Sequence, residues 1–240
     1  MPRKPNTIAQ YTSEDFPIDR RQPVAEQLYE VIRERIVSLE LEPGAPITDS
    51  AIALAAGVSR TPAREALKRL EDEGLIHIYP SQGSSIAKIR IRLVEEAIFL
   101  REMLEPEVAA RCAALRDRQA LVDKLDEVTG RQRFAIEKEG GRRVYGLDEA
   151  FHQTLFQACS LEMTWRAVMT ARGQMDRIHY LGKRTALVPR RALTQHLSIV
   201  EAIKKGDVAM ARSRMLSHIS GNRDILAKAR QAKGEYFEND

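Results

Sequence analysis

Hydrophobic residues recur at helical spacing in the first third of the chain. Between Pro23 and Leu39 they stand three or four positions apart, which predicts an amphipathic helix. The turn Glu42-Pro43-Gly44 ends this helix. Two further helices are expected because capping residues and glycines bracket two apolar segments. The residues that mark their starts and ends are Thr48 or Asp49, Gly57, Ser59, Pro62 and Gly74.

Two short β-like runs follow the third helix. Leu75–Tyr79 and Ile86–Ile89 flank the turn Pro80-Ser81-Gln82-Gly83, and this arrangement predicts a β-hairpin. Helix, helix, tight turn, helix and hairpin is the order of a winged helix-turn-helix, in which the hairpin forms the wing.

Beyond Ile91 the pattern is helical throughout, with one-sided apolar stripes that predict a bundle around its own core. The expected fold is therefore mainly α: an N-terminal winged helix-turn-helix with a short β-hairpin wing, followed by a C-terminal all-α helical bundle. Residues 1–20 lack a sustained period and are expected to be a flexible arm, before the winged helix-turn-helix at 21–90 and the all-helical domain at 91–240. The six helices expected in the bundle lie near 92–116, 118–138, 143–158, 162–181, 190–205 and 207–231.

Composition narrows the class of protein. No apolar run approaches the roughly 20 residues of a membrane-spanning helix, and residues 1–10 do not resemble a secretory signal peptide. With Cys112 and Cys159 the only cysteines, we expect reduced thiols and a cytoplasmic protein. Of the net charge of +4, residues 1–90 carry −1, so any DNA binding by that part must depend on a local basic cluster.

Such a basic cluster lies on the third predicted helix. Arg60, Arg64 and Lys68 follow one another at intervals of four residues and so share one helical face, opposite the apolar face. Arginine can bond two acceptors of guanine in the major groove, and Ser59 and Thr61 can bond phosphate from the helix start. Gly83 would let the wing backbone approach the duplex. The alternative interpretation is a solvated charged face and an ordinary turn glycine.

The segment GVSRTPAREAL at residues 57–67, followed by RLEDEGL at 69–75, resembles the DNA-binding domain of the GntR family of bacterial transcription regulators. Ala63 stands where this family often has Val, and Pro46 to Asp49 depart from the more usual Leu and Glu. The resemblance implies a homodimer on double-stranded DNA with a pseudo-palindromic operator. It favours Ser59, Arg60, Thr61, Arg64 and Gly83 as DNA contacts.

Potential metal ligands occur on three predicted helices of the bundle. Asp148 and His152 stand four residues apart on one helix, while His196 and His218 lie on later helices. A bundle can bring such residues to one point, and three imidazoles with one carboxylate suit a divalent transition metal: Zn²⁺, Ni²⁺, Mn²⁺ or Fe²⁺. The alternative is that each histidine is an ordinary hydrogen-bonded residue.

The segments DEAFHQTL (148–155), QHLSIVEAI (195–203) and MLSH (215–218) resemble the FCD ligand-binding domain of the FadR/VanR branch. The expected helix count resembles the six-helix VanR-type version more than the alternative seven-helix version. In that branch these four positions hold a metal. An open position on the metal can accept the carboxylate of a small effector, and Arg101 and Asn222 are candidates to line the pocket. For Arg101 the alternative is an ion pair with Glu105, four residues further on.

The sequence therefore predicts a transcriptional regulator that senses a small organic acid through a bound metal. A ligand changes DNA binding only if it prefers one dimer geometry over another. Two other functions remain open: a metal-dependent hydrolytic enzyme, and a regulator for which the metal itself is the signal. No nucleophile constellation or phosphate-binding loop supports the enzyme.

Overall fold

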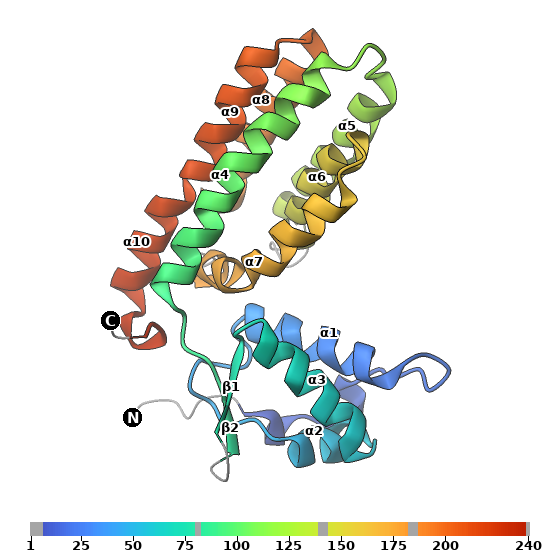
Figure 1. The fold of residues 1–240 in the computed structure, drawn as a ribbon, viewed down its shortest axis with the longest axis vertical. Helices are drawn as coiled ribbons and strands as arrows, with labels where there is room; N and C mark the ends of the chain where they lie inside the picture. Colours follow the sequence, from blue (N-terminus) through green and yellow to red (C-terminus); the bar gives the residue numbers. More distant parts are fainter. Residues whose placement is uncertain (1–6, 80–82, 139–143, 182–186, 239–240) are drawn as a thin grey trace. The chain divides into compact units, whose positions relative to one another are not determined.

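The computed structural model describes residues 7–79, 83–138, 144–181 and 187–238 (Figure 1). The chain forms two compact units. The first comprises Met1–Val94, Ala171–Leu181 and Lys228–Asp240, and the second comprises Glu95–Thr170 and Gly182–Ala227. Neither unit is a single continuous segment, because residues 171–181 and the C-terminal residues belong to the first unit.

Three helices and a hairpin form the winged helix-turn-helix of the first unit: α1 (Val24–Val37), α2 (Asp49–Ala56), α3 (Arg60–Asp72), β1 (Ile76–Tyr79) and β2 (Gly83–Ile86) (Figure 1). The hydroxyl of Thr48 accepts a hydrogen bond from the backbone N–H of Ala51, so the cap of α2 is Thr48. Gly57 ends α2 with a φ of +64°, a left-handed conformation that glycine adopts without steric cost. Leu28, Ile32 and Leu70 are among the buried residues that join these helices.

The hairpin is antiparallel, with Tyr79 paired to Gly83 and Ile76 to Ile86. The second strand was expected at 86–89, and this position was wrong: the strand comprises Gly83–Ile86, of which Gly83 had been assigned to the turn. The predicted turn residues 80–82 lie outside the described part of the chain. The backbone of Ile89 instead bridges to Phe237 near the C-terminus.

Residues 7–20 differ from the flexible arm that was expected. They contain two short 3₁₀ helices, Ile8–Gln10 and Ser13–Asp15, and they bury Ile8 and Phe16 in the core of the winged domain. The guanidinium of Arg35 stacks over the ring of Phe16 at 4.7 Å. Two widely spaced apolar residues are too few to produce a helical period, so this packing left no periodic signal in the sequence.

Seven helices cover the described part of residues 91–232: α4 (Ile91–Ala114), α5 (Gln119–Lys138), α6 (Val144–Ala158), α7 (Glu162–Leu181), α8 (Leu187–Lys205), α9 (Val208–Ser220) and α10 (Asn222–Ala232). The second unit buries Phe151, Leu155 and Ile199 among its core residues. The prediction of six helices was wrong because Gly221 interrupts the last one, and the side-chain amide of Asn222 donates to the carbonyl of Ile219 at the break.

The second half of α7 packs within the first unit. The side-chain amide of Gln174 donates to the carbonyl of Gly74, and buried Arg177 donates to the carbonyl of Ala87. Burial lowers the pKa of Arg177 to about 9. Cys112 and Cys159 are both free thiols, the first buried and the second partly buried. Among the described helices, none combines the length and the apolar character needed to cross a bilayer.

Candidate metal centre and nucleic-acid interface

Four potential metal ligands converge in the second unit. Asp148 and His152 lie one turn apart on α6, His196 lies on α8 and His218 on α9. One ligand atom from each residue lies within 4.8 Å of the corresponding atoms of the others. His152 and His196 are fully buried. The fold thus brings together the four residues that the sequence singled out.

The three imidazoles present the same ring nitrogen to a common point. Nε2 of His218 lies 3.2 Å from Nε2 of His196 and 3.3 Å from Nε2 of His152, and Oδ1 of Asp148 lies 3.5 Å from Nε2 of His196. The ring of Phe151 stacks on His196 with centroids 3.9 Å apart, and so restricts the orientation of that imidazole.

Two glutamines define which nitrogen of these rings carries the proton. Nδ1 of His196 donates to Oε1 of Gln132 at 3.0 Å, and Nδ1 of His218 donates to Oε1 of Gln195 at 3.1 Å, because an amide oxygen only accepts. Burial lowers the pKa of both histidines well below the usual 6.5, so both rings are neutral. Their Nε2 lone pairs therefore face each other at 3.2 Å, an arrangement that a cation between them would stabilise. The donor set fits a divalent transition metal.

A buried ion pair supports the third imidazole. Nδ1 of His152 lies 2.6 Å from Oε2 of Glu105. Nε of Arg101 donates to the other oxygen of Glu105, and Nη2 of Arg101 lies 3.3 Å from Nε2 of His152. Burial raises the pKa of Glu105, but the guanidinium charge of Arg101 and the hydrogen bonds to this carboxylate outweigh it, and the pKa lies well below its usual value.

The contacts of Arg101 agree with both predictions made for it, the ion pair with Glu105 and a place beside the ligand cluster. It pairs with Glu105 on its own helix, and its guanidinium also borders the histidine cluster. Asn222, the other pocket candidate, is buried at the start of α10. The sequence did not identify Gln132 and Gln195 as partners of the histidines. The available signals were the position of Gln195 beside His196 and a polar Gln132 on the buried face of α5.

The candidate DNA contacts lie at the surface of the first unit. The side chains of Arg60 and Arg64 on α3 are 62% and 72% exposed, while the opposite face of the helix is buried in the core. Lys68 is exposed and pairs with Glu71 and Asp72. The remaining candidates, Ser59, Thr61 and Gly83, are also exposed.

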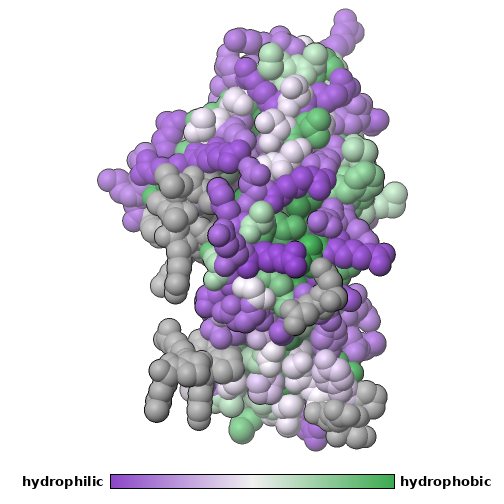
Figure 2. Space-filling view, turned by 90° about the vertical axis from the view of Figure 1, so that its left-hand side faces the viewer, coloured by the Kyte–Doolittle hydropathy of each residue, from purple (hydrophilic) through white to green (hydrophobic). Residues whose placement is uncertain are grey.

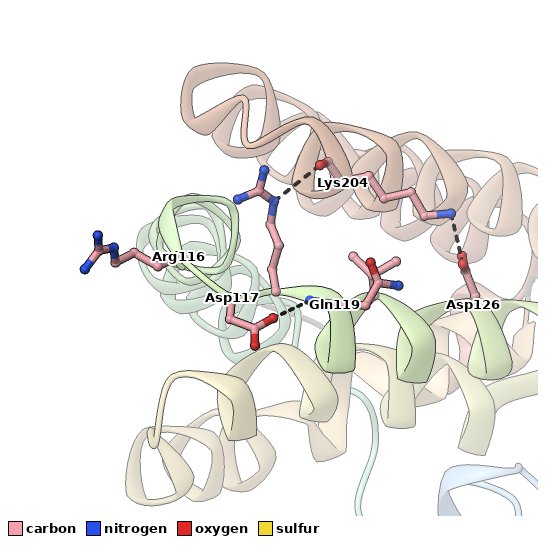
Figure 3. A pocket seen from close by; sticks show the side chains of 7 residues that line it. Arg116, Asp117, Gln119, Asp126 and Lys204 are labelled. Carbon is pink, nitrogen blue, oxygen red and sulfur yellow. Dashed lines mark hydrogen bonds and ion pairs between the residues drawn. The ribbon is translucent and has the colours of Figure 1, made fainter.

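A hollow of about 540 Å³ lies elsewhere in the second unit, between the start of α5 and the end of α8 (Figure 3). Lys204 reaches across it to Asp126 at 2.9 Å, and Arg118 donates to the carbonyl of Lys204. The hollow shares no lining residue with the histidine cluster. Lys204 and Arg118 already bind protein groups here, so we do not assign the effector to this hollow.

A winged helix-turn-helix joined to a helical domain with a buried polar cluster defines a class of protein, the DNA-binding regulators with a separate sensory domain. The chain matches the profile of the bacterial regulatory proteins of the gntR family at residues 24–86 and that of the FCD domain at residues 96–221. It belongs to the GntR family, and its helical domain is an FCD domain. It is a DNA-binding transcriptional regulator and not an enzyme.

Similar proteins agree with this assignment. The chain is 34% identical over 219 residues to an HTH-type transcriptional regulator in an unstable DNA locus of Streptomyces ambofaciens, covering 89% of each chain. It is 31% identical over 219 residues to the HTH-type transcriptional repressor RspR of Escherichia coli strain K12, covering 91% of this chain and 96% of RspR. The solved structure of McbR/YncC from E. coli has the same fold, with a TM-score of 0.73 at 20% identity over 85% of this chain and 97% of that one.

Proposed function

We propose that the protein is a homodimeric repressor whose FCD domain binds a small carboxylate through a divalent transition metal. Asp148, His152, His196 and His218 would hold the ion. When bound, the metal supplies a Lewis acid with coordination positions left open for an anion. The observation that carries this proposal is the convergence of three imidazole Nε2 atoms, two of them from neutral rings, beside a carboxylate.

The surroundings of the cluster favour an anionic effector. Arg101 places its Nη2 3.3 Å from Nε2 of His152, so a cation at the cluster would stand close to a guanidinium. An anion with two oxygens would reduce the repulsion between these charges and could accept hydrogen bonds from Arg101. A metabolic carboxylate meets this requirement, and a neutral molecule does not.

An exposed apolar surface on α4 and α9 supports a homodimer. Phe99 and Met103 share one stripe of α4 and are 59% and 57% exposed, and Leu216 on α9 is also exposed. Glu107 lies one turn from Met103 on α4, and Arg212 lies one turn from Leu216 on α9. An ion pair of 2.7 Å joins Glu107 to Arg212, so the two apolar stripes are adjacent. On the face drawn in Figure 2, hydrophobic residues likewise interrupt a mainly hydrophilic surface. A second copy of the chain would cover the α4–α9 stripes and give the isologous contact of a two-fold dimer.

DNA binding by the dimer would place α3 of each subunit in the major groove. Two half-sites about one helical turn apart match such a pair of recognition helices, so a change in their spacing prevents simultaneous docking. The assignment as a repressor rests on the name of the relative RspR. The effector would act by favouring a dimer geometry in which the helices no longer fit both half-sites.

The proposal is tested with purified protein analysed for bound metal and then screened against metabolic carboxylates by thermal shift, with and without a chelator. We expect a stoichiometric transition metal and a carboxylate-dependent rise in melting temperature that the chelator abolishes. His196→Gln should lose both responses, whereas His77→Gln in the wing should keep them. Equal shifts in chelated and metal-loaded protein would contradict the metal-mediated mechanism.

A second measurement separates the effector from the metal as signal. Release of selected operator DNA is followed by fluorescence anisotropy while metal or carboxylate is added alone or together. Release that requires the carboxylate supports the proposal. Release by metal alone would show that the ion itself is the signal.

A further inference from the structure

Asp49 connects the two helices of the helix-turn-helix through their charged side chains. It is the first residue of α2, and its carboxylate accepts hydrogen bonds from two arginines of α3. Nη2 of Arg60 lies 2.9 and 3.1 Å from the two carboxylate oxygens, and Nε and Nη2 of Arg64 lie 3.2 and 3.0 Å from Oδ2. One acidic group thus holds two successive arginines of the predicted reading face.

The carboxylate lies underneath the guanidinium groups. The side chain of Asp49 is 15% exposed, against 62% and 72% for Arg60 and Arg64. Each guanidinium has five N–H donors, so several remain directed to solvent after the bonds to Asp49 are made. Burial raises the pKa of Asp49, but the hydrogen bonds from Arg60 and Arg64 outweigh it and leave the pKa below its usual value.

The helix cap at Thr48 fixes the backbone at Asp49. Thr48 caps the helix that Asp49 begins, with its hydroxyl 3.1 Å from the backbone nitrogen of Ala51. The partners of Lys68 are different, because Glu71 and Asp72 belong to the same helix as the lysine and place it along the helix surface. Only a group on α2 can hold the α3 arginines in a geometry set by the packing of the two helices.

We infer that Asp49 is a positioning residue that sets the base specificity of Arg60 and Arg64. An arginine held in one orientation meets guanine with less loss of side-chain entropy and with its donors already aligned. A free arginine can reach phosphates equally well, and phosphate contacts carry no sequence information directly. Asp49 therefore lowers non-specific affinity and increases discrimination between sequences. This inference rests on the proposed docking of α3 in the major groove.

The test uses a pool of random duplexes selected on the full-length wild-type protein, followed by titrations with the enriched duplex and with a scrambled one. For Asp49→Asn, which keeps the side-chain size, we expect equal or tighter binding of the scrambled duplex. The ratio of specific to non-specific affinity should fall by about tenfold, the discrimination of one bidentate arginine contact. The dependence of non-specific log K on log salt should steepen by up to about one unit, as a freed arginine reaches a phosphate.

Asp19→Asn is the matched control, because Asp19 also pairs with an arginine, Arg21, but lies outside the helix-turn-helix. It should leave the affinity ratio unchanged. If Asp49→Asn does not fold, Asp49→Ser removes the carboxylate with a residue that suits a helix start. A purely structural role would lower specific and non-specific binding in the same proportion, and this outcome, or an unchanged ratio, would overturn the inference. Failure of the wild-type protein to enrich any sequence would instead contradict the proposed function.

Discussion

Nε2 of His196 and Nε2 of His218 face each other at 3.2 Å, although the two residues come from different helices. Both rings carry their proton on Nδ1, where Gln132 and Gln195 accept it, so neither Nε2 can donate to the other. The contact is unfavourable in the protein alone and becomes favourable when a cation accepts both lone pairs. This relationship leads directly to the first prediction.

Transition metals should stabilise the protein where Ca²⁺ and Mg²⁺ do not, since imidazole ligands favour the former. At a free concentration 100 times the Kd, mass action gives about 2.7 kcal/mol of stabilisation. Thermal unfolding with Zn²⁺, Ni²⁺, Mn²⁺ or Mg²⁺ after chelator treatment measures the effect. His218→Gln should remove the response, and an equal response to Mg²⁺ would count against an imidazole site.

Stability in chelator should fall as the pH decreases below about 6.5. Burial holds the pKa of His196 and His218 far below that value in the folded protein, whereas the unfolded chain titrates near it, so the unfolded state binds more protons. Each histidine contributes about 1.4 kcal/mol per pH unit in this window and nothing above it. Urea unfolding at pH 7.5 and 5.5 measures the loss, and His196→Gln with His218→Gln should reduce it.

Glu105→Gln should weaken metal binding by about 10- to 100-fold, the usual effect of removing a carboxylate that supports a histidine ligand. The charge of Glu105, 2.6 Å from Nδ1 of His152, makes that imidazole a more basic ligand. Competition with a chromophoric chelator gives the affinity. Glu127→Gln is the control, because Glu127 pairs with Arg131 on the surface of α5. An affinity equal to that of the control would exclude a supporting role for Glu105.

Phe99→Glu should dissociate the proposed dimer. A charge at this exposed apolar position would have to be buried without a partner, which costs several kcal/mol and raises the dimer Kd by at least about 100-fold. Sedimentation velocity over a concentration series measures the shift. Phe134→Glu, on an equally exposed phenylalanine of α5, should leave the association unchanged. If Phe99→Glu stays dimeric, the interface lies elsewhere.

Phe16→Ala should destabilise the winged domain by about 3–5 kcal/mol, the usual cost of truncating a buried phenylalanine. Phe16 is 3% exposed and packs against Arg35. Chemical denaturation followed by circular dichroism gives the free energy of unfolding. Phe134→Ala should cost little, because Phe134 is exposed. A similarly small cost for Phe16→Ala would mean that residues 7–20 do behave as a flexible arm.

Interactions between residues close in sequence could be predicted. The apolar period of α1, the Thr48 cap and Gly57 determine where the helices of the winged domain begin and end. Asp148 and His152 share a face of α6 because they stand one turn apart. The break at Gly221 was missed because the hydrophobic pattern continues across it, while the hydrogen-bond ladder does not.

The sequence by itself determined that a winged helix-turn-helix precedes an all-helical domain, that α3 carries a cationic face, and which histidines are available as ligands. Only the tertiary structure decided that Gln132, Gln195 and Glu105 face those histidines, that Asp49 holds Arg60 and Arg64, and that Phe16 joins a core. The reason is physical. Local periodicity depends on a few neighbouring residues, whereas contacts between helices depend on how whole surfaces pack, and no short pattern in the chain encodes that packing.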